Sequence, residues 1–410
     1  METELLAPVT APPAAATQPC PVCGSAAGEV FYEAHGVPTQ SGILWPTAEA
    51  ARHAPTTDIR LVFCPHCHYM HNEAYEAGKI THTRNDFSLE FSPSFRAFTL
   101  GLATDLVERY NVRGGRIVDI GCGDGDFLRT LCRLGGNTGL GIDPGYASPP
   151  GLPAGTNEAL GVTFVKDYFG PATAQVLEGA TFISCRHMLN VLAGHVTQFV
   201  RDLRAAIPAG ATPTVYVEVP NALYDIGEQV VWNIVNEHAS WFTPASLSYL
   251  FRSAGFEVLD VQPCWHGEYI GLTARPTTIP EAATLAPTDD PDTPAAVRAF
   301  GSSARRVIGE WAERVDELRR SGRRVVGWGA GSRAMSFLTT FDLADTVQAV
   351  VDINPRRQGQ FLPLTAHPVI APEQLLSYQP DLLLITNPTY AAEILAQARQ
   401  LGFAGDSLVL

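Results

Sequence analysis

The sequence predicts an α/β protein with a Rossmann-like core, a small cysteine-containing domain before it and a second Rossmann-like α/β domain after it. Three observations predict this class. An apolar strand pattern at 117–120 runs into a glycine-rich turn and then a helical pattern. Two Cys-Pro-x-Cys steps lie before it, and a second strand, glycine turn and helix follows at 324–338. A chain of 410 residues has the length for two or three domains.

Composition divides the chain into five segments. Residues 1–18 are rich in Ala and Pro without a basic cluster, so we expect a disordered lead-in and not a signal peptide. The cysteine-containing domain is expected at 19–84 and the central Rossmann-like domain at 85–275. A linker rich in Pro, Thr, Ala and Asp follows at 276–294. The last domain is expected at 295–410.

Charge and hydropathy exclude two classes of partner. The net charge is −14 and no Lys/Arg-rich run occurs, which argues against binding of a nucleic-acid backbone. No segment reaches the roughly 18 consecutive apolar residues of a membrane span. We therefore expect a cytoplasmic protein with reduced or metal-bound cysteines and a small-molecule substrate.

Four of the eight cysteines form two matching pairs, in Cys20-Pro21-Val22-Cys23 and Cys64-Pro65-His66-Cys67. Each step forms a tight knuckle that presents two thiolates to one tetrahedral ion. The long gap between the knuckles leaves room for strands near 31–32 and at 59–63. The pattern predicts a structural zinc ion, Zn(2+), and a zinc-binding domain. Because four thiolates close the coordination shell, the metal is given no catalytic role. The predicted ligands are Cys20, Cys23, Cys64 and Cys67.

Two other roles for these four cysteines are less favoured by the sequence. Disulfides are disfavoured by the expected compartment, and a redox dithiol is disfavoured because the motif occurs twice. The nearby His66, His68 and His71 can substitute as ligands. The remaining cysteines are scattered and are expected to pack as small hydrophobic side chains. They are Cys122, Cys132, Cys185 and Cys264.

The glycine turn of the central domain reads G-x-G-x-G, not the dinucleotide pattern G-x-G-x-x-G. Gly121 and Gly123 follow the apolar strand and allow a tight turn and close approach of backbone to a ligand. Asp119 stands at the strand end just before them. A carboxylate at that place can hold the ammonium group of a ligand, which a pyrophosphate would not favour.

Two further acids follow the next strands. Asp143 ends the strand at 139–142, about 20 residues after the glycine turn, where a carboxylate can accept hydrogen bonds from ribose hydroxyls. Asp167 and Tyr168 follow the strand at 162–165 and can reach an adenine edge. A glycine turn that binds nothing, or an NAD site, remains the alternative. In order and spacing the acid, turn and second acid resemble the S-adenosylmethionine (SAM) site of a class I methyltransferase.

The rest of the central domain supplies candidate catalytic residues. A helix from Pro93 carries apolar residues at helical spacing and is expected to cover the mouth of the sheet, either as packing or in contact with substrate. The strand at 180–184 delivers His187 at its carboxyl end, where open α/β sheets bind ligands. Another strand is expected at 214–219. Glu237 and His238 then precede a helix near Pro244, and strands at 255–259 and 269–274 are expected to form an antiparallel hairpin.

The last domain repeats the nucleotide-site pattern. A long helix is expected from about 295 to 319, followed by a strand and glycine turn at 324–332. Further strands are expected at 347–352 and 382–386. Taken alone, the turn and Asp352 suggest a nucleotide.

In combination, these motifs resemble a known family. The paired knuckles, Asp119-Ile120-Gly121-Cys122-Gly123, Cys185-Arg186-His187, Glu237-His238 and the last domain occur in this order. The chain resembles the three-domain, zinc-containing, SAM-dependent sugar C-methyltransferases, which act on nucleotide-linked 4-keto sugars in antibiotic pathways. The resemblance covers nearly the whole chain from Cys20.

The resemblance implies a class I (Rossmann-like) methyltransferase core, and a substrate-facing role for His187, Glu237 and His238. It also implies that the last domain holds the distal part of the substrate and binds no second cofactor. An NAD-type site there and pure scaffolding are the alternatives. The chain departs from the family at Val235, where a tyrosine is usual, and Trp241 stands where tyrosine is frequent. Tyrosine is also missing from the aromatic stretch at Phe87 and Phe91.

The chemistry can be argued without the family. Carbon becomes a nucleophile when a base removes the proton beside a carbonyl, and an imidazole titrates near the working pH. His238 is the predicted base, His187 the donor that steadies the enolate oxygen, and Glu237 a residue that orients a neighbour. A single histidine base also serves transfer to oxygen or nitrogen. The sequence therefore predicts a SAM-dependent methyltransferase (EC 2.1.1.-) acting on carbon, with an O- or N-methyltransferase of a natural-product intermediate as the alternative.

Overall fold

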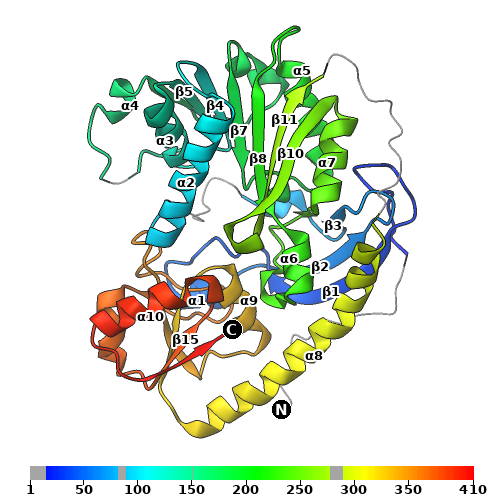
Figure 1. Ribbon diagram of the computed structural model, residues 1–410. Helices are drawn as coiled ribbons and strands as arrows, with labels where there is room; N and C mark the ends of the chain where they lie inside the picture. Colours follow the sequence, from blue (N-terminus) through cyan, green and yellow to red (C-terminus); the bar gives the residue numbers. More distant parts are fainter. Residues whose placement is uncertain (1–14, 82–88, 150, 278–289) are drawn as a thin grey trace.

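The computed structural model describes residues 15–81, 89–149, 151–277 and 290–410, which form three β-sheets with their helices (Figure 1). A seven-stranded sheet lies at the centre of the chain. A four-stranded sheet comes mainly from the N-terminal residues, and a five-stranded parallel sheet lies in the C-terminal segment. The α/β class and the Rossmann-like core predicted from sequence are confirmed.

The central sheet has the strand order β10-β11-β8-β7-β4-β5-β6. Six strands run in the same direction, and β11 runs antiparallel to its neighbours β8 and β10, as the hairpin prediction required. The chain order reverses between β4 and β7, so the ligand crevice of an open α/β sheet is expected at their carboxyl ends. The strands are β4 (Arg116–Ile120), β5 (Thr138–Ile142), β6 (Val162–Val165), β7 (Phe182–Arg186), β8 (Thr214–Pro220), β10 (Phe256–Cys264) and β11 (Tyr269–Pro276).

Helices cover both faces of this sheet because its strands are apolar on both sides. On one face, α2 (Pro93–Arg109) and α3 (Asp126–Gly135) pack over Ile117, Phe182 and Tyr216. On the other face, α5 (Val196–Ala206) and α7 (Pro244–Ser253) pack over Val118, Ile183 and their neighbours. Two short helices, α4 (Thr156–Ala159) and α6 (Ala222–Gly227), lie in the connections.

The N-terminal sheet takes its fourth strand from the central segment. Its order is β1-β2-β3-β9, with β1 (Glu29–Pro38), β2 (Thr56–Phe63) and β3 (Met70–Asn72). The fourth strand, β9 (Ser240–Trp241), pairs antiparallel with β3 and begins two residues after His238 in the chain. A short helix, α1 (Ala48–Arg52), lies between β1 and β2. The N-terminal sheet thereby fixes the segment that carries the predicted base.

The C-terminal segment begins with α8 (Asp292–Ser321), one turn longer than the predicted helix because Asp290 accepts hydrogen bonds from the backbone N–H groups of Asp292 and Thr293. The sheet order is β14-β13-β12-β15-β16, all parallel. One face packs on α8 and α9 (Ser332–Thr340), the other on α10 (Ala391–Gln400). The strands are β12 (Val325–Trp328), β13 (Val347–Val351), β14 (Val369–Ile370), β15 (Leu382–Ile385) and β16 (Asp406–Val409).

Short 3₁₀ turns complete the described elements. They lie at Ala77–Lys79, Pro171–Leu177, Leu189–Val191, Ala193–His195, Val231–Asn233, Trp265–Gly267, Pro372–Tyr378 and Pro388–Tyr390.

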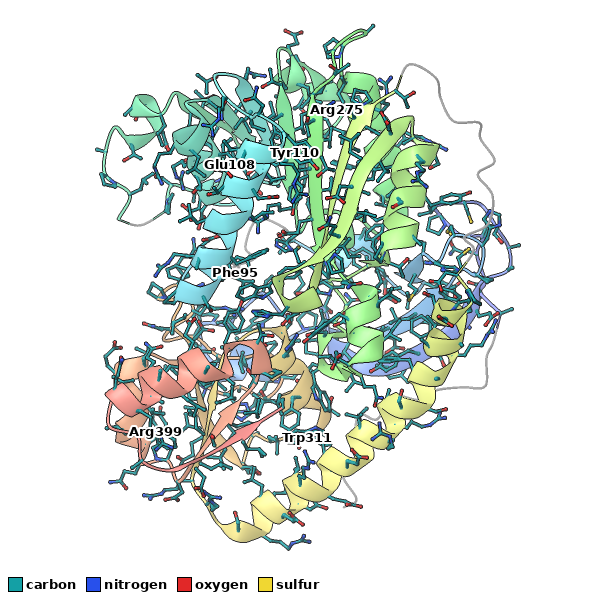
Figure 2. The ribbon with its side chains drawn as sticks, viewed as in Figure 1. Phe95, Glu108, Tyr110, Arg275, Trp311 and Arg399 are labelled. Atoms are coloured by element: carbon teal, nitrogen blue, oxygen red, sulfur yellow. The ribbon has the colours of Figure 1, made fainter. Side chains whose placement is uncertain are left out.

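The carboxyl edges of the two parallel sheets face each other. Arg333, just after β12, pairs with Glu268, which stands beside the end of β8 (Asn221 N–H to Glu268 C=O, 2.9 Å). Arg356, after β13, donates to Asp124 of the central glycine turn over 2.8 Å. Figure 2 shows Phe95 at the end of α2 that points toward the C-terminal segment. Both sheets therefore direct their carboxyl edges toward one shared interface.

Some predictions fall on residues that the structure does not describe. Residues 1–14 of the predicted lead-in, residues 278–289 of the predicted linker, and Phe87 of the aromatic stretch lie outside the described residues. Phe91 is described, and Arg356 lies over its ring with its guanidinium carbon 5.5 Å from the centroid. None of the helices in the described ranges combines the length and the apolar character needed to cross a membrane.

Candidate active site and metal-binding cluster

The two cysteine knuckles meet in space. The sulfur atoms of Cys20, Cys23, Cys64 and Cys67 all lie within 4.8 Å of one another. Cys20 and Cys67 are 3.7 Å apart and Cys23 and Cys64 are 3.5 Å apart, sulfur to sulfur. Tetrahedral thiolates about 2.3 Å from zinc stand about 3.8 Å from one another. The geometry and the donor set therefore fit one tetrahedral ion.

The histidines near the knuckles lie outside this cluster. The ring of His66 meets Tyr249 edge-on, that of His68 lies against Phe63, and that of His71 stacks on Tyr69. Within the described residues, the four cysteines form the one group of His, Cys, Asp or Glu side chains with metal-ligand spacing. Their knuckles pack into the apolar core of the central domain, where Thr197 of α5 donates to the carbonyl of Pro21 over 2.7 Å.

The central glycine turn has the backbone that its sequence requires. Gly121, Gly123 and Gly125 have φ angles of +70°, +52° and +80°, which side-chain-bearing residues rarely adopt. A Cβ atom on Gly125 would stand 2.5 Å from the ring of Phe164, so that glycine is needed for packing as well. A Cβ atom on Gly123 would meet no described atom within 4 Å, so the turn leaves room for a ligand there.

Asp119 is buried beneath the turn. Its carboxylate accepts one hydrogen bond, from the hydroxyl of Ser184 over 2.6 Å. Burial raises the pKa of Asp119 to about 6, although Ser184 and the nearby Arg186 oppose the rise. A buried carboxylate with an elevated pKa gains from a cationic partner. Asp119 therefore fits the ammonium group of a SAM aminocarboxypropyl chain.

Asp143 fastens the turn to the next strand. Its two carboxylate oxygens accept hydrogen bonds from the backbone N–H groups of Gly123 (3.0 Å) and Gly145 (2.7 Å). Each oxygen keeps a further lone pair, so the carboxylate can still accept from two ribose hydroxyls. The order of Asp119, open glycine turn and Asp143 thus fits the two polar ends of SAM.

The predicted adenine-edge residues lie farther out. Tyr168 is 57% exposed, and its backbone N–H donates to the Asp167 carboxylate over 2.7 Å. Their adenine role stays a prediction. Sequence reasoning missed a different aromatic pair: Tyr146 stacks on Phe164 with ring centroids 3.9 Å apart, next to Gly125. The sequence feature that could have indicated this pair is the position of Tyr146, three residues after Asp143.

His238 is half-buried, and one nitrogen of its ring has no polar partner within the described ranges. Its Nδ1 atom has no hydrogen-bond partner among the described residues. Burial lowers the pKa of His238 to about 4, with His187 contributing in the same direction. Trp241 meets the His238 ring edge-on and donates its indole N–H to the His238 carbonyl over 2.7 Å. His238 is thus a neutral imidazole near pH 7.

Glu237 points to the N-terminal segment. Its carboxylate accepts from the backbone N–H and the hydroxyl of Ser41 and from the backbone N–H of Gly42, the last over 2.9 Å. Burial raises the pKa of Glu237, and these hydrogen bonds oppose the rise. The structure therefore places Glu237 where it fixes the loop at 41–42 beside His238.

His187 sits in an unusual backbone conformation at the end of β7. Its φ is +54°, and its backbone N–H donates to the carbonyl of Glu218 over 2.8 Å. Its Nε2 atom lies 2.8 Å from Oε1 of Glu218, and its ring meets Tyr269 edge-on with centroids 4.6 Å apart. A positive φ in a non-glycine residue is a frequent mark of a functional site.

Glu218 is a residue that the sequence analysis did not single out. It is fully buried in β8, where Arg186 donates to Oε1 over 2.9 Å and Tyr216 to Oε2 over 3.0 Å. Burial would raise the pKa of Glu218, but Arg186 and His187 outweigh it and hold the pKa at about 2. An ionisable residue inside the otherwise apolar pattern Thr214-Val215-Tyr216-Val217-Glu218-Val219 was the available signal.

The C-terminal sheet edge carries a second set of polar groups. Arg333 is buried and donates to Asn233, Asn387 and Glu268 over 2.5, 2.8 and 3.1 Å. Arg357 is 7% exposed, and its Nε and Nη2 atoms have no partner among the described residues. Its Nη1 atom lies 3.6 Å from Asp352. Buried donors without partners mark this edge as able to receive an anionic or carbonyl-rich ligand.

Two protein-family models match separate segments of the chain. Residues 95–261 match a protein-family model described as a methyltransferase domain. Residues 287–410 match one described as the C-methyltransferase C-terminal domain. The central SAM-type turn and the facing C-terminal sheet each lie within one of these matches.

The chain is also similar to individual proteins. It is 28% identical over 313 residues to the C-methyltransferase NovU of Streptomyces niveus, covering 72% of this chain and 71% of that protein. It is 17% identical to 1,6-didemethyltoxoflavin-N1-methyltransferase of Burkholderia thailandensis, solved with S-adenosylhomocysteine. That likeness covers 45% of this chain and 81% of the other, with a TM-score of 0.34.

Proposed function

Because this chain is a SAM-dependent C-methyltransferase, we propose that it methylates a carbon beside a carbonyl in a small-molecule biosynthetic intermediate. We propose a nucleotide-linked keto sugar as the substrate class. The observation that carries the proposal is the setting of two histidines at one sheet edge. The Nδ1 atom of the half-buried His238 has no partner among the described residues, whereas His187 contacts the Glu218 carboxylate.

The residues that would hold SAM are those of the central turn. Asp119 would take the ammonium group, Gly121 and Gly123 would let the backbone approach, and Asp143 would take the ribose hydroxyls. Tyr168 and Asp167 would stand at the adenine edge. When bound, SAM supplies an electrophilic methyl group on its sulfonium.

His238 is proposed as the base that removes the proton beside the carbonyl. A base must be unprotonated when it acts, and the pKa of about 4 keeps His238 unprotonated at pH 7, although it also makes the ring a weaker base than an imidazole that titrates near pH 7. The proton moves from the substrate carbon to a nitrogen of the ring. Glu237, next to His238 in the chain, supports this step indirectly. Its carboxylate accepts hydrogen bonds from Ser41 and Gly42 and so fixes the segment 237–238 against the loop at 41–42.

His187 is proposed as the donor to the substrate oxygen. As the proton leaves, negative charge develops on that oxygen, and a positioned N–H donor stabilises it. His187 stands at the carboxyl end of β7, next to the strand that leads into the glycine turn. The two histidines thus divide the work between carbon and oxygen.

The C-terminal sheet edge is proposed to hold the distal part of the substrate. Arg357 offers two buried, unpartnered guanidinium nitrogens, and Asn354 offers a buried amide nitrogen. A guanidinium fork suits a phosphate. Asp352 already accepts from the backbone N–H groups of Ala330 and Asn354, which favours this role over a second dinucleotide site.

The four-cysteine cluster is proposed to bind one structural zinc ion. Its sulfur–sulfur spacings support this ion, and four thiolates leave no open coordination position. The metal then holds the N-terminal sheet together and takes no part in the reaction.

Hydrogen exchange tests the proposal. Wild-type protein with a nucleoside-diphosphate-linked 4-keto sugar in deuterated water, without SAM, is expected to exchange the proton beside the carbonyl. His238→Asn is expected to bind SAM normally while exchange and methyl transfer fall roughly 10²–10⁴-fold. Mass spectrometry follows exchange and calorimetry follows SAM binding.

Each other result reassigns a role. Exchange that persists in His238→Asn but stops in His187→Asn reverses the two histidines. A wild-type enzyme that methylates a substrate without exchanging this proton acts on oxygen or nitrogen, which is the alternative function.

A further inference from the structure

We propose that Glu218 is the positioning residue of His187: its carboxylate holds the Nε2–H of the imidazole and so directs Nδ1 to the substrate oxygen. This inference rests on the proposed function, because it gives His187 its role at the enolate oxygen. It adds a carboxylate–histidine pair to the site, with the carboxylate one strand away from the histidine it orients.

The contact is built by two adjacent parallel strands. Arg186 of β7 pairs with Glu218 of β8 in the sheet register, and the backbone N–H of His187 donates to the Glu218 carbonyl over 2.8 Å. His187 then leaves the strand with a φ of +54°. This turn brings its Nε2 atom to 2.8 Å from Oε1 of the same Glu218, an ion-pair distance at which the N–H direction is not aligned for a hydrogen bond. Backbone and side chain of one glutamate thus hold one histidine.

The carboxylate itself is immobilised. Glu218 has no exposed surface. Arg186 contacts Oε1 through Nε at 2.9 Å and Nη2 at 2.8 Å, while Tyr216 donates to Oε2 over 3.0 Å. The Arg186 guanidinium lies over the ring of Phe127, 4.4 Å from its centroid. A carboxylate fixed on both oxygens can impose an orientation on the ring that contacts it.

The consequence for His187 follows from imidazole chemistry. A carboxylate accepts hydrogen bonds and cannot donate one, so the ring nitrogen that contacts it carries the proton. With Nε2 protonated, Nδ1 is the nitrogen left for a ligand. Nδ1 has a lone pair in that tautomer, so the ring donates to the substrate oxygen only as the imidazolium, with a proton on each nitrogen and its charge balanced by the Glu218 carboxylate. No such carboxylate contacts His238, whose Nδ1 has no partner among the described residues.

The other groups around His187 do not compete for this role. Tyr216, Tyr269 and Cys264 have pKa values raised by burial and are neutral near pH 7. His238 is neutral there as well, with a pKa of about 4. Glu90 has its pKa raised by burial and faces Arg186. Among the described groups, Arg186 and Glu218 are therefore the charged partners of this histidine.

The tautomer of His187 tests the inference on the unmodified protein. Nitrogen-15 chemical shifts of the full-length, metal-loaded chain, labelled on histidine and free of substrate, distinguish Nδ1–H from Nε2–H in the neutral ring. We expect Nε2–H for His187. A neutral ring protonated on Nδ1 would overturn the proposal, with no variant needed.

Glu218→Gln tests the consequence for catalysis. The amide keeps the shape and loses the charge, and we expect mixed tautomers at His187. Exchange of the proton beside the carbonyl of a nucleoside-diphosphate-linked 4-keto sugar is expected to fall roughly 10–100-fold with little change in KM. Glu257→Gln makes the same change at an exposed position of β10 in the same sheet and is the matched control, expected to keep both the tautomer and the rate.

The outcomes separate this inference from the proposed function. Wild-type rates in a folded Glu218→Gln protein would overturn the positioning role. Equal losses in Glu218→Gln and Glu257→Gln would overturn it too, since they would show that removing any carboxylate from the central sheet has this effect. A wild-type protein that shows the Nε2–H tautomer but exchanges no proton supports the Glu218–His187 pair and contradicts the proposed reaction.

Discussion

Asp119 combines almost complete burial with a proposed role for its negative charge. Its pKa of about 6 lies above the usual value because burial outweighs the hydrogen bond from Ser184. Only the ionised form can hold an ammonium group. SAM affinity is therefore expected to be constant above about pH 6 and to fall as pH drops through that value, about tenfold per unit.

Calorimetry between pH 5 and pH 8 measures this dependence. Ser184→Ala removes a hydrogen bond that lowers the pKa of Asp119, so the break in the affinity curve is expected to move to higher pH. An affinity that is flat down to pH 5 in both proteins would separate Asp119 from the ammonium group.

Asp143 has two tasks, since it fastens Gly123 and is proposed to bind ribose. Asp143→Ala is expected to weaken SAM binding at least tenfold, because charge-assisted hydrogen bonds contribute about 1.5–3 kcal/mol each. Asp167→Ala is the comparison, because its exposed carboxylate contacts the backbone of Tyr168; a smaller loss is expected. Calorimetry at pH 7.5 gives both affinities, and equal affinities in wild type and Asp143→Ala would place the nucleoside elsewhere.

Single residues were predictable where chemistry and chain position coincide. Asp119, the glycines and Asp143 follow strand ends, and the structure brings them together as spacing suggested. Glu218 was not predictable in the same way. Its partners Arg186 and His187 come from a neighbouring strand, and a strand pairing that joins residues 186 and 218 leaves no mark in the local pattern.

At the level of elements, the cysteine knuckles are the clearest case for a test. Metal analysis of the purified chain is expected to give one zinc per protein. Cys20→Ser with Cys64→Ser is expected to lose the metal and the N-terminal sheet, because the binding energy of a structural site is folding energy. Cys132→Ala, which removes a buried thiol outside the cluster, is the control and is expected to keep the ratio. Full folding of the double variant without metal would contradict the structural role.

The periodicity of apolar residues predicted the long helices and strands, but it did not predict the shortest strands. The strands of the central sheet and α8 carry enough apolar residues for their type to be read from sequence, although α8 begins earlier because of the Asp290 cap. Strands β9 and β14 contain two residues each. Such strands exist because a partner edge is present, so tertiary pairing decides them and local propensity does not.

For the whole molecule, Arg333 is the main polar link between the two facing sheet edges. Its buried guanidinium pairs with Glu268 and also donates hydrogen bonds to Asn233 and Asn387. Arg333→Met leaves a buried carboxylate without its partner, which is expected to cost about 3–5 kcal/mol of unfolding free energy. Adding Glu268→Gln is expected to recover part of that loss. Denaturant unfolding of the two single variants and the double variant measures it.

An exposed ion pair provides the matched comparison. Arg298 pairs with Glu29 between α8 and β1, with its side chain 56% exposed. Solvent screens such a pair, so Arg298→Ala is expected to change stability little. A loss in Arg298→Ala as large as that in Arg333→Met would show that burial is not what makes the Arg333 link strong.

The relative placement of the domains was beyond the reach of sequence reasoning. The motifs predicted two Rossmann-like units, but the contacts that turn their carboxyl edges toward each other join residues far apart in the chain, such as Asp124 with Arg356. Periodicity reports which face of an element is buried, not which partner buries it. The substrate role of the C-terminal domain therefore entered the sequence analysis only through the family resemblance.

Strand β9 has a consequence for recombination between related chains. The N-terminal sheet is completed by Ser240 and Trp241, and Tyr69 beside the second knuckle contacts the Ser240 hydroxyl at 2.5 Å. A crossover after residue 84 would combine the N-terminal segment of one protein with strand β9 of another. Strand β9 begins two residues after His238, so a mismatch in this pairing would lie next to the proposed base. A chimera is expected to keep full activity when residues 236–241 come from the same parent protein as the N-terminal sheet. The two segments must match because they pair in one sheet, although they lie far apart in the chain.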